Sequence, residues 1–218
     1  TLVKKISEHI SGKVTIISQD DYYLDKSDLA IEEQMILNFD HPDAINFSLL
    51  LEHLTSLKEG KPIFGRHYDF LKLTNIQGEE NYPTDIIVVE GFLLFLIPEI
   101  MNIFDVKIFM DTDDDIRLSR RLIRAHMQFG WTYDQILNQW HNTVKPMHDQ
   151  FVEPTKKYAD FIVKGNKNTQ LAVELISSFI KISKTSFFLL STKNLFFCIT
   201  NLIVRYVFVV FLIKSNLK

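Results

Sequence analysis

Three acidic side chains stand at the ends of apolar runs, where parallel strands usually place ligand-binding groups. Asp20 follows the run VTIIS, Glu90 ends the run DIIVVE, and Asp111 ends the run VKIFMD. Continuous apolar runs of this length are typical of strands buried on both faces of a parallel sheet. Ligands bind beyond the carboxyl ends of such strands, so we expect the three carboxylates to lie at one edge of a sheet.

A structural role explains some of these acids better than others. Asp111 and Asp113 precede a helical pattern, and we interpret them as acids that satisfy free backbone donors at the start of a helix. Glu90 instead follows an apolar run and precedes Gly91. This arrangement is how many phosphate-transfer enzymes present a Mg²⁺ ligand, so Glu90 is a candidate for that role.

Four arginines share one broad face of the helix expected after Asp113. They recur at spacings of three and four residues: Arg117, Arg120, Arg121 and Arg124. Such a stripe is either a solvated surface or, beside strand-end carboxylates, a clamp for phosphate and hydroxyl groups, because a guanidinium binds oxyanions through two hydrogen bonds. The seven histidines show no zinc-type spacing.

The segment FDHPDAINF, residues 39–47, has two interpretations. Asp40 and Asp43 flank a His-Pro pair, and Phe39 lies beside them. A carboxylate in such a turn can accept hydrogen bonds from the vicinal hydroxyls of a sugar, while the aromatic ring packs against the sugar ring. The alternative is an ordinary proline turn that leads into the next helix.

Apolar runs and helical periodicities alternate along the chain. This alternation predicts an α/β fold with a parallel sheet and helices on both faces. Strands are expected at 14–18, 85–91, 106–111 and 158–163, and helices at 1–11, 28–37, 47–58, 113–127, 132–144 and 168–180.

The composition is that of an ordinary globular protein. With 218 residues, of which 46% are hydrophobic, the chain is long enough to bury a core of its own. A net charge of −3 argues against a general nucleic-acid binder, which would carry a basic excess. The single cysteine, Cys198, excludes an intrachain disulfide and favours a reducing compartment, the cytoplasm.

Residues 183–218 differ from residues 1–182, and we expect a domain boundary between them. The first 180 residues hold all 27 acidic residues and 18 of the 24 basic ones, which gives them a net charge of −9. Residues 196–213 are long enough for a membrane span, but Arg205 near their middle costs about 2.5–3.5 kcal/mol to insert. The alternatives are a membrane anchor and translated non-coding sequence, and the composition favours the second.

From Thr1 to about Ile180 the chain resembles the uridine–cytidine kinases, a family of P-loop nucleoside kinases. Six segments occur in the family's order and approximate spacing: SQDDYY, NFDHPDA, GRHYDF, VVEG, DTDDDIRLSRRLIR and TVKPMHDQFVEPTKKYAD. The resemblance implies a P-loop kinase fold and the transfer of phosphate from ATP, with Mg²⁺, to the 5′-hydroxyl of uridine or cytidine in pyrimidine salvage. By analogy it also implies a homo-oligomer.

The resemblance gives each matching residue a role. Asp20 would be the catalytic carboxylate that faces the 5′-hydroxyl and also lies near Mg²⁺, with Glu90 as the second acid on the metal side. Arg124 would contact the phosphates of ATP, and Asp21 would be a bystander. The nucleoside would be bound by Tyr23 and Phe39 as walls, Asp40 on the ribose hydroxyls, Tyr68 and Phe70 on the pyrimidine, and Arg121 and Gln139 on the sugar.

The sequence departs from the family pattern at three places. It contains no G-x-x-x-x-G-K-[ST] motif, whose backbone and lysine cradle phosphates. We therefore expect a domain that is incomplete before Thr1, with the first central strand missing, two inner strands with unpaired edges, low stability and weak ATP binding. Leu73 stands where the family usually has a base-contacting histidine, and the lid reads MQFGWT, without the family's arginines around Gly130.

Two other functions stay open. A catalytically inactive relative would retain nucleoside binding or subunit association without phosphoryl transfer, and a longer kinase–phosphoribosyltransferase fusion would carry this domain as one part. Leu73 and the lid favour the inactive relative. The set Asp20, Asp40, Glu90 and Arg121 favours the enzyme.

Overall fold

A computed structural model describes most of the chain. The described residues are 2–10, 13–30, 33, 37–165, 169–180 and 206–211. The α-helices are α1 (Leu2–His9), α3 (Phe47–Lys58), α4 (Pro98–Met101), α5 (Asp114–Phe129), α6 (Tyr133–Gln139) and α7 (Lys145–Met147), and residues 170–180 are also helical. The strands are β1 (Val14–Ser18), β2 (Ile63–Asp69), β3 (Thr74–Asn81), β4 (Ile86–Glu90), β5 (Val106–Asp111), β6 (Phe161–Lys164) and β7 (Tyr206–Phe211).

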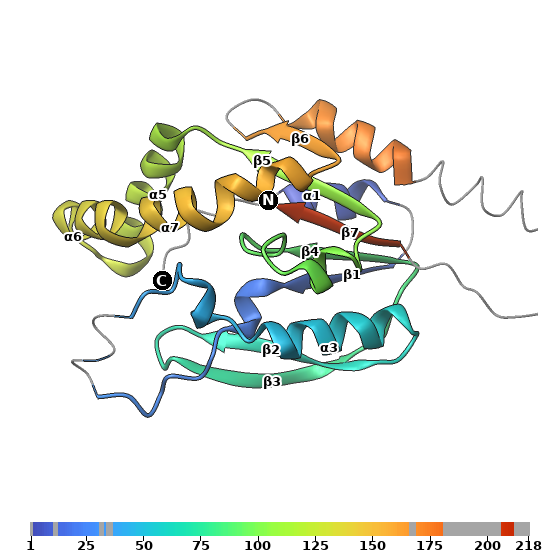
Figure 1. Cartoon of the computed structure of the whole chain (residues 1–218), viewed down its shortest axis with the longest axis horizontal. Coiled ribbons are helices and arrows are strands. Elements are labelled where there is room, and N and C mark those ends of the chain that lie inside the picture. The colour runs from blue at the N-terminus through green and yellow to red at the C-terminus, as the bar shows by residue number, and fades with distance from the viewer. Residues whose placement is uncertain are drawn as a thin grey trace, which may run out of the picture.

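Shorter helical turns connect these elements. Three are 3₁₀ turns, η1 (Gln19–Tyr22), η2 (Pro42–Ala44) and η5 (Glu153–Tyr158), and two are π-helical, η3 (Trp140–Val144) and η4 (His148–Val152). The π-helical turns alternate with α6 and α7, so residues 133–152 form one irregular helical arm (Figure 1).

A five-stranded sheet with the strand order β1-β4-β7-β5-β6 forms the centre of the fold, and every neighbouring pair in it is parallel. The predicted parallel α/β architecture is therefore confirmed. The expectation that two inner strands would have unpaired edges is wrong, because β7 lies between β4 and β5 and pairs with both. Figure 1 shows this strand, in red, within the sheet.

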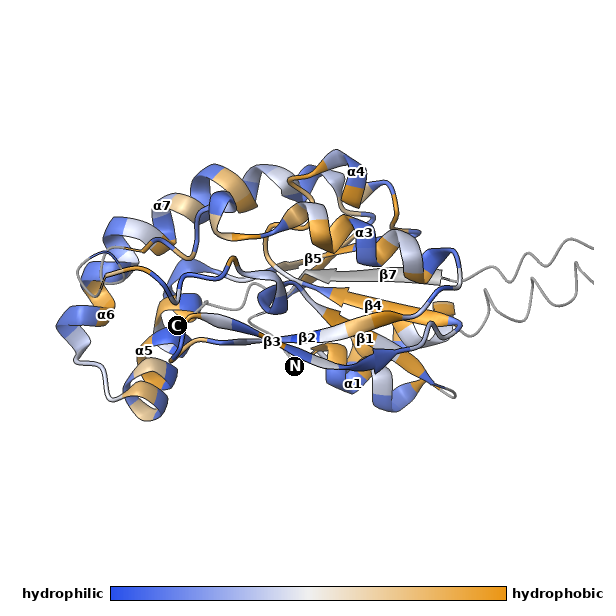
Figure 2. Cartoon of the chain, turned by 90° about the horizontal axis from the view of Figure 1, so that it is seen from below, coloured by the Kyte–Doolittle hydropathy of each residue, from blue (hydrophilic) through white to orange (hydrophobic). Residues whose placement is uncertain are grey.

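Helices cover both faces of the sheet because β4 and β5 bury apolar side chains on both of their faces. Ile87 and Val89 belong to one core, together with Leu50 and Leu54 of α3. The alternate residues of the same strand belong to a second core, which also contains α1 and part of the helix at 170–180. The two cores are separated by the sheet itself, and Figure 2 shows α3 and α4 on one side of it and α1 on the other.

The antiparallel hairpin of β2 and β3 was not expected from the sequence. It forms a separate two-stranded sheet with a register shift between Phe64 and Arg66. The hairpin turn contains Leu73, the one non-glycine residue with a positive φ (54°) among the described residues. Lys26 donates its backbone N–H to the carbonyl of Leu73, which joins the chain after η1 to this turn.

Several predicted boundaries differ from the observed ones. Residues 27–29 form a turn and a bend at the start of the expected helix at 28–37, residue 33 is helical, and the rest of 31–36 lies outside the described residues. β6 begins at Phe161, three residues later than expected. The expected domain boundary at 182 and most of the expected span at 196–213 also lie outside the described residues. In the described part of the chain, no helix has the length and apolar content that crossing a bilayer requires.

Candidate active site

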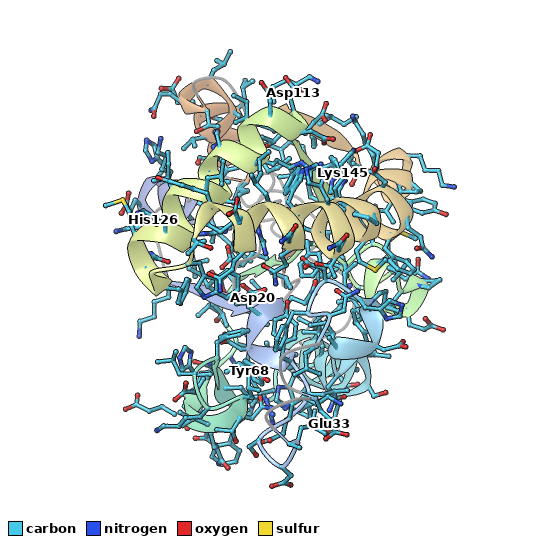
Figure 3. All side chains as sticks on the ribbon, turned by 90° about the vertical axis from the view of Figure 1, so that its left-hand side faces the viewer. Asp20, Glu33, Tyr68, Asp113, His126 and Lys145 are labelled. Atoms are coloured by element: carbon cyan, nitrogen blue, oxygen red, sulfur yellow. The ribbon has the colours of Figure 1, made fainter. Side chains whose placement is uncertain are left out.

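The carboxyl edge of the sheet brings Asp20 and Glu90 to neighbouring positions. Ser18, the last residue of β1, pairs in register with Glu90, the last residue of β4. Asp20 follows in η1, two residues beyond Ser18, and is half-buried. In the view of Figure 3 Asp20 lies between the hairpin that carries Tyr68 and the helical arm above it.

Asp40 is a buried carboxyl group that faces both an acid and a base. Its residue is 8% exposed, and its backbone N–H donates to Oδ1 of Asn38. Burial raises the pKa of Asp40 to about 6, the positive charge of Arg121 opposes this change, and the negative charge of Asp20 adds to it. The structure therefore places Asp40 close enough to both Arg121 and Asp20 for their charges to act on it.

Arg121 is fully buried on α5 and connects this helix to α6. Its Nη2 donates to Oε1 of Gln139 at 2.6 Å, while Nε and Nη1 have no hydrogen-bond partner among the described residues. Burial lowers the pKa of Arg121 to about 10, and the charge of Asp40 opposes this change. A guanidinium stays protonated even then, so Nε and Nη1 are charged donors without a partner among the described residues.

The positions of Arg121 and Gln139 depend on how α5 ends and α6 begins. Gly130 closes α5 with a φ of 67°, a conformation that favours glycine. Thr132 then caps α6, where it and Gln135 form a reciprocal capping box. The short connection folds α6 back against α5, and Gln139, the last residue of α6, comes to lie beside Arg121.

Arg124 lies one turn further along α5 and also faces the site. It is half-buried, burial lowers its pKa, and the negative charge of Asp20 opposes that change. Arg124 and Asp20 thus attract one another across the site. The guanidinium of Arg124 beside Asp20 is suited to bind a negatively charged ligand.

Four aromatic rings that were expected to contact a nucleoside form one cluster. The ring centroids of Tyr23 lie 5.5 Å from Phe39, 5.4 Å from Tyr68 and 5.3 Å from Phe70. The rings of Tyr68 and Phe70 are 4.4 Å apart and nearly perpendicular. Three separate elements supply these residues, so the cluster exists only in the folded chain.

The four rings differ in how much of them a ligand can reach. Tyr23 and Tyr68 are 2% and 0% exposed, and their hydroxyl groups donate to the carbonyls of Phe39 and Leu24. Burial raises the pKa values of both tyrosines, that of Tyr68 to about 12. Phe39 and Phe70 are half-buried. The two tyrosines are thus the buried part of the aromatic cluster, and the two phenylalanines are its accessible part.

Asp111 and Asp113, the acids interpreted as structural, lie at the end of β5 and at the start of α5. Asp111 forms ion pairs with Lys156 and Lys164, whose hydrogen bonds outweigh the effect of burial and lower the pKa of Asp111. Asp113 is the N-cap residue of α5, but its side chain makes no capping hydrogen bond, so the capping interpretation is wrong for Asp113. Asp21, the expected bystander, lies 3.5 Å from the ring nitrogen Nδ1 of His67.

Gln19 is a buried polar residue beside the site to which the sequence analysis assigned no role. Its side chain is fully buried, and its Oε1 accepts a hydrogen bond from the backbone N–H of Leu93 at 2.9 Å. The sequence feature that could have indicated a role for Gln19 is its position: it follows the apolar run VTIIS and directly precedes Asp20 and Asp21. An amide there is expected to bond to a neighbouring strand end, but the sequence does not say which one.

The chain is similar in sequence to several kinases. The family model of the phosphoribulokinase/uridine kinase family matches residues 2–172. The uridine kinase of Clostridium novyi (strain NT) is 43% identical over 169 residues, which cover 77% of this chain and 81% of that protein. The uridine kinase of Listeria innocua serovar 6a is 38% identical over 183 residues, 83% of this chain and 88% of the relative.

The fold is similar to that of a solved kinase structure. A putative fructose transport system kinase from Silicibacter sp. TM1040 superposes with a TM-score of 0.55 and 20% sequence identity, over 68% of this chain and 74% of that one. At this identity the likeness shows the fold alone.

Proposed function

The chain belongs to the phosphoribulokinase/uridine kinase family, and from this premise we propose that it transfers a phosphoryl group from ATP to the 5′-hydroxyl of uridine or cytidine. The observation that carries the proposal is the grouping of Asp20, Asp40 and Arg121 next to the aromatic cluster. A reactive carboxylate, a sugar-binding carboxylate and an apolar surface for the base are what the nucleoside side of the reaction needs. We place the reaction in the cytoplasm, and we expect the chain to self-associate.

Asp40 and Arg121 bind the ribose in this proposal. The ionised carboxylate of Asp40 accepts hydrogen bonds from the vicinal hydroxyls. A hydrogen bond with one charged partner contributes about 1.5–3 kcal/mol to binding. Arg121 offers Nε and Nη1 to a sugar oxygen, while Gln139 holds Nη2. The base packs against Phe39 and Phe70, and the two buried tyrosines keep these rings in place.

Asp20 acts on the hydroxyl group that is phosphorylated. A primary alcohol is a poor nucleophile at neutral pH. A carboxylate within hydrogen-bond reach accepts its proton as the new P–O bond forms and the bond from the γ-phosphorus to the leaving ADP breaks. Arg124 attracts Asp20 across the site and donates to the oxygens of the transferred phosphoryl group. The remaining rate enhancement comes from holding the 5′-oxygen in line with the phosphorus atom.

Asp20 and Glu90 would hold the magnesium ion that accompanies ATP. The described residues contain no group of three or more His, Cys, Asp or Glu side chains that could enclose a metal. Mg²⁺ in kinases commonly uses one or two carboxylates together with substrate phosphates and water, so two acids on adjacent strand ends fit it. The ion would neutralise charge on the phosphates of ATP.

The test separates nucleoside binding from phosphoryl transfer. Calorimetric titration with uridine and 2′-deoxyuridine measures binding, and the release of ADP in the presence of Mg²⁺ and ATP measures turnover. We expect uridine to bind about 10–100-fold more tightly than 2′-deoxyuridine, because the deoxy sugar lacks a hydroxyl that faces Asp40. Binding without turnover would point to the inactive relative. A chain that binds neither nucleoside would contradict the proposal.

A further inference from the structure

Gln19 links the two acid-bearing segments of the site. Its Oε1 accepts from the backbone N–H of Leu93, 74 residues further along the chain. Gln19 directly precedes Asp20, and Leu93 lies three residues after Glu90. Both Gln19 and Leu93 are fully buried. One side-chain hydrogen bond in the interior therefore connects the turn after β1 to the loop after β4.

Gly91 shows how closely the two segments approach each other. A Cβ atom on Gly91 would lie 2.4 Å from both Cβ and Oε1 of Gln19, and 2.9 Å from its Cδ. The carboxamide of Gln19 thus lies directly over the residue that follows Glu90. Any other residue at position 91 would push the two segments apart, and this contact sets the spacing between the backbones that carry Asp20 and Glu90.

The far end of η1 is held as well. The hydroxyl group of Tyr22 lies 2.9 Å from Nδ1 of His53 on α3, and the carbonyl of Tyr22 accepts from the backbone N–H of Asn46. Tyr22 is 3% exposed. A four-residue turn with both ends buried and bonded has little freedom, so the position of Asp20 follows from the positions of Gln19 and Tyr22.

The amide nitrogen Nε2 of Gln19 indicates that this side chain does more than fill space in the core. Because the Leu93 N–H requires an acceptor, the amide orientation is determined and Nε2 points the other way. Nε2 is buried and has no hydrogen-bond partner among the described residues. An unsatisfied buried donor costs free energy, and such groups in native structures call for an explanation, often a functional one.

We infer that Gln19 is a positioning residue for phosphoryl transfer, which holds Asp20 at the correct distance from Glu90 through its bond to Leu93 and its contact with Gly91. This inference rests on the proposed function. Groups that act together in a transition state must be held within about half an ångström of their working geometry. The residues that bind the nucleoside come from other elements, so a shift of η1 affects the chemical step more than uridine binding.

Two substitutions disturb this contact from opposite sides. Gln19→Met keeps the volume but loses the hydrogen bond, and Gly91→Ala displaces the carboxamide without changing it. For both we expect kcat for uridine to fall about tenfold or more while the KM for uridine changes less than about threefold. Gln19→Glu, which keeps an acceptor for the Leu93 N–H, should recover part of the loss. Amide hydrogen exchange at Leu93 should become faster in Gln19→Met.

A control in β1, the strand that leads into η1, removes side-chain hydrogen bonds near the other end of that strand. Thr15 is 8% exposed, and its Oγ1 donates to the carbonyl of Tyr82. Thr15→Val should lower the melting temperature and leave kcat and KM nearly unchanged. If Gln19→Met behaves like Thr15→Val, Gln19 is a structural residue only and the inference is wrong. If the unsubstituted chain shows no turnover at all, the proposed function fails first and the inference fails with it.

Discussion

Arg121 on α5 and Gln139 on α6 are joined by a 2.6 Å hydrogen bond inside the candidate site. Both residues were expected to contact the sugar, and the structure shows that they contact each other. Gln139 occupies one nitrogen of the guanidinium, and the other two have no hydrogen-bond partner among the described residues. The amide thereby orients the arginine that faces Asp40.

A double-mutant cycle tests this coupling. Arg121→Lys and Gln139→Leu should each weaken uridine binding, and together by less than the sum, because either change alone breaks the same contact. We expect a coupling energy of about 1–3 kcal/mol in the calorimetric binding free energies. Ser119→Ala, on the exposed side of α5, should combine additively with either change. Additive effects of Arg121→Lys and Gln139→Leu would show that the two residues act independently.

The raised pKa of Asp40 predicts a pH dependence of uridine binding. Burial keeps this carboxyl group protonated up to about pH 6, and only the ionised form accepts two hydroxyl hydrogen bonds. Uridine affinity should therefore fall as the pH drops below about 6, at most about tenfold per pH unit for one proton. Asp40→Asn should bind weakly at all pH values, without this dependence. A wild-type affinity that stays constant from pH 5 to 7.5 would contradict the assignment of Asp40.

The raised pKa of Asp40 also predicts how the free energy of unfolding changes with pH. Between its ordinary pKa of 3.8 and its raised value of about 6, Asp40 binds more protons in the folded chain than in the unfolded chain. Its contribution to the free energy of unfolding is therefore lost as the pH rises through this interval. Urea titrations of wild type and Asp40→Asn at pH 4.5 and 6.5 measure it, and the wild type should lose more stability over this interval than the variant.

Leu73 offers a test of backbone strain. Its φ of 54° places a branched side chain in the left-handed region, which costs about 1 kcal/mol or more for a residue other than glycine or asparagine. Leu73→Asn should raise the free energy of unfolding by about 1 kcal/mol, because asparagine tolerates this conformation. Leu71, 87% exposed in the same turn, has no positive φ, so Leu71→Asn is the control and should have little effect. Equal effects of the two substitutions would show that Leu73 is not strained.

The position of β7 predicts that its backbone is essential to the sheet. Val209 pairs with Val89 on one side and Lys107 on the other, so a proline there removes a backbone donor between two neighbouring strands. Val209→Pro should lower the free energy of unfolding far more than Val209→Ala, which keeps the N–H. Urea titration measures both. Equal losses would mean that residues 206–211 do not pair within the sheet.

The sequence predicted the parallel sheet well because its strands are continuous apolar runs. The runs at 14–18 and 106–111 became β1 and β5 with the predicted bounds, and α3 covers residues 47–58 as expected. Such strands are buried on both faces, so their composition alone identifies them. The hairpin of β2 and β3 was missed because its burial alternates weakly and β3 is largely exposed.

The sequence predicted that two strand-end acids would be neighbours, but it did not predict the contacts around them. Strand ends in a parallel sheet meet at one edge, so the grouping of Asp20 and Glu90 followed from the order of the elements. The contact between Gln19 and Gly91 depends on backbone spacing, which no residue pattern encodes. The entry of β7 between β4 and β5 was also unpredictable, because an apolar segment far along the chain fits a sheet, a core or a membrane equally well.

The central claim is that Asp20 accepts the proton of the 5′-hydroxyl group, and Asp20→Asn tests it most directly. The measurement is the steady-state rate of uridine phosphorylation with Mg²⁺ and ATP, together with calorimetric binding of uridine, for wild type, Asp20→Asn and the control Asp21→Asn. We expect kcat to fall about 10²–10⁴-fold in Asp20→Asn, with uridine affinity nearly retained, and to stay near wild type in Asp21→Asn. Turnover by Asp20→Asn at the wild-type rate would contradict the account.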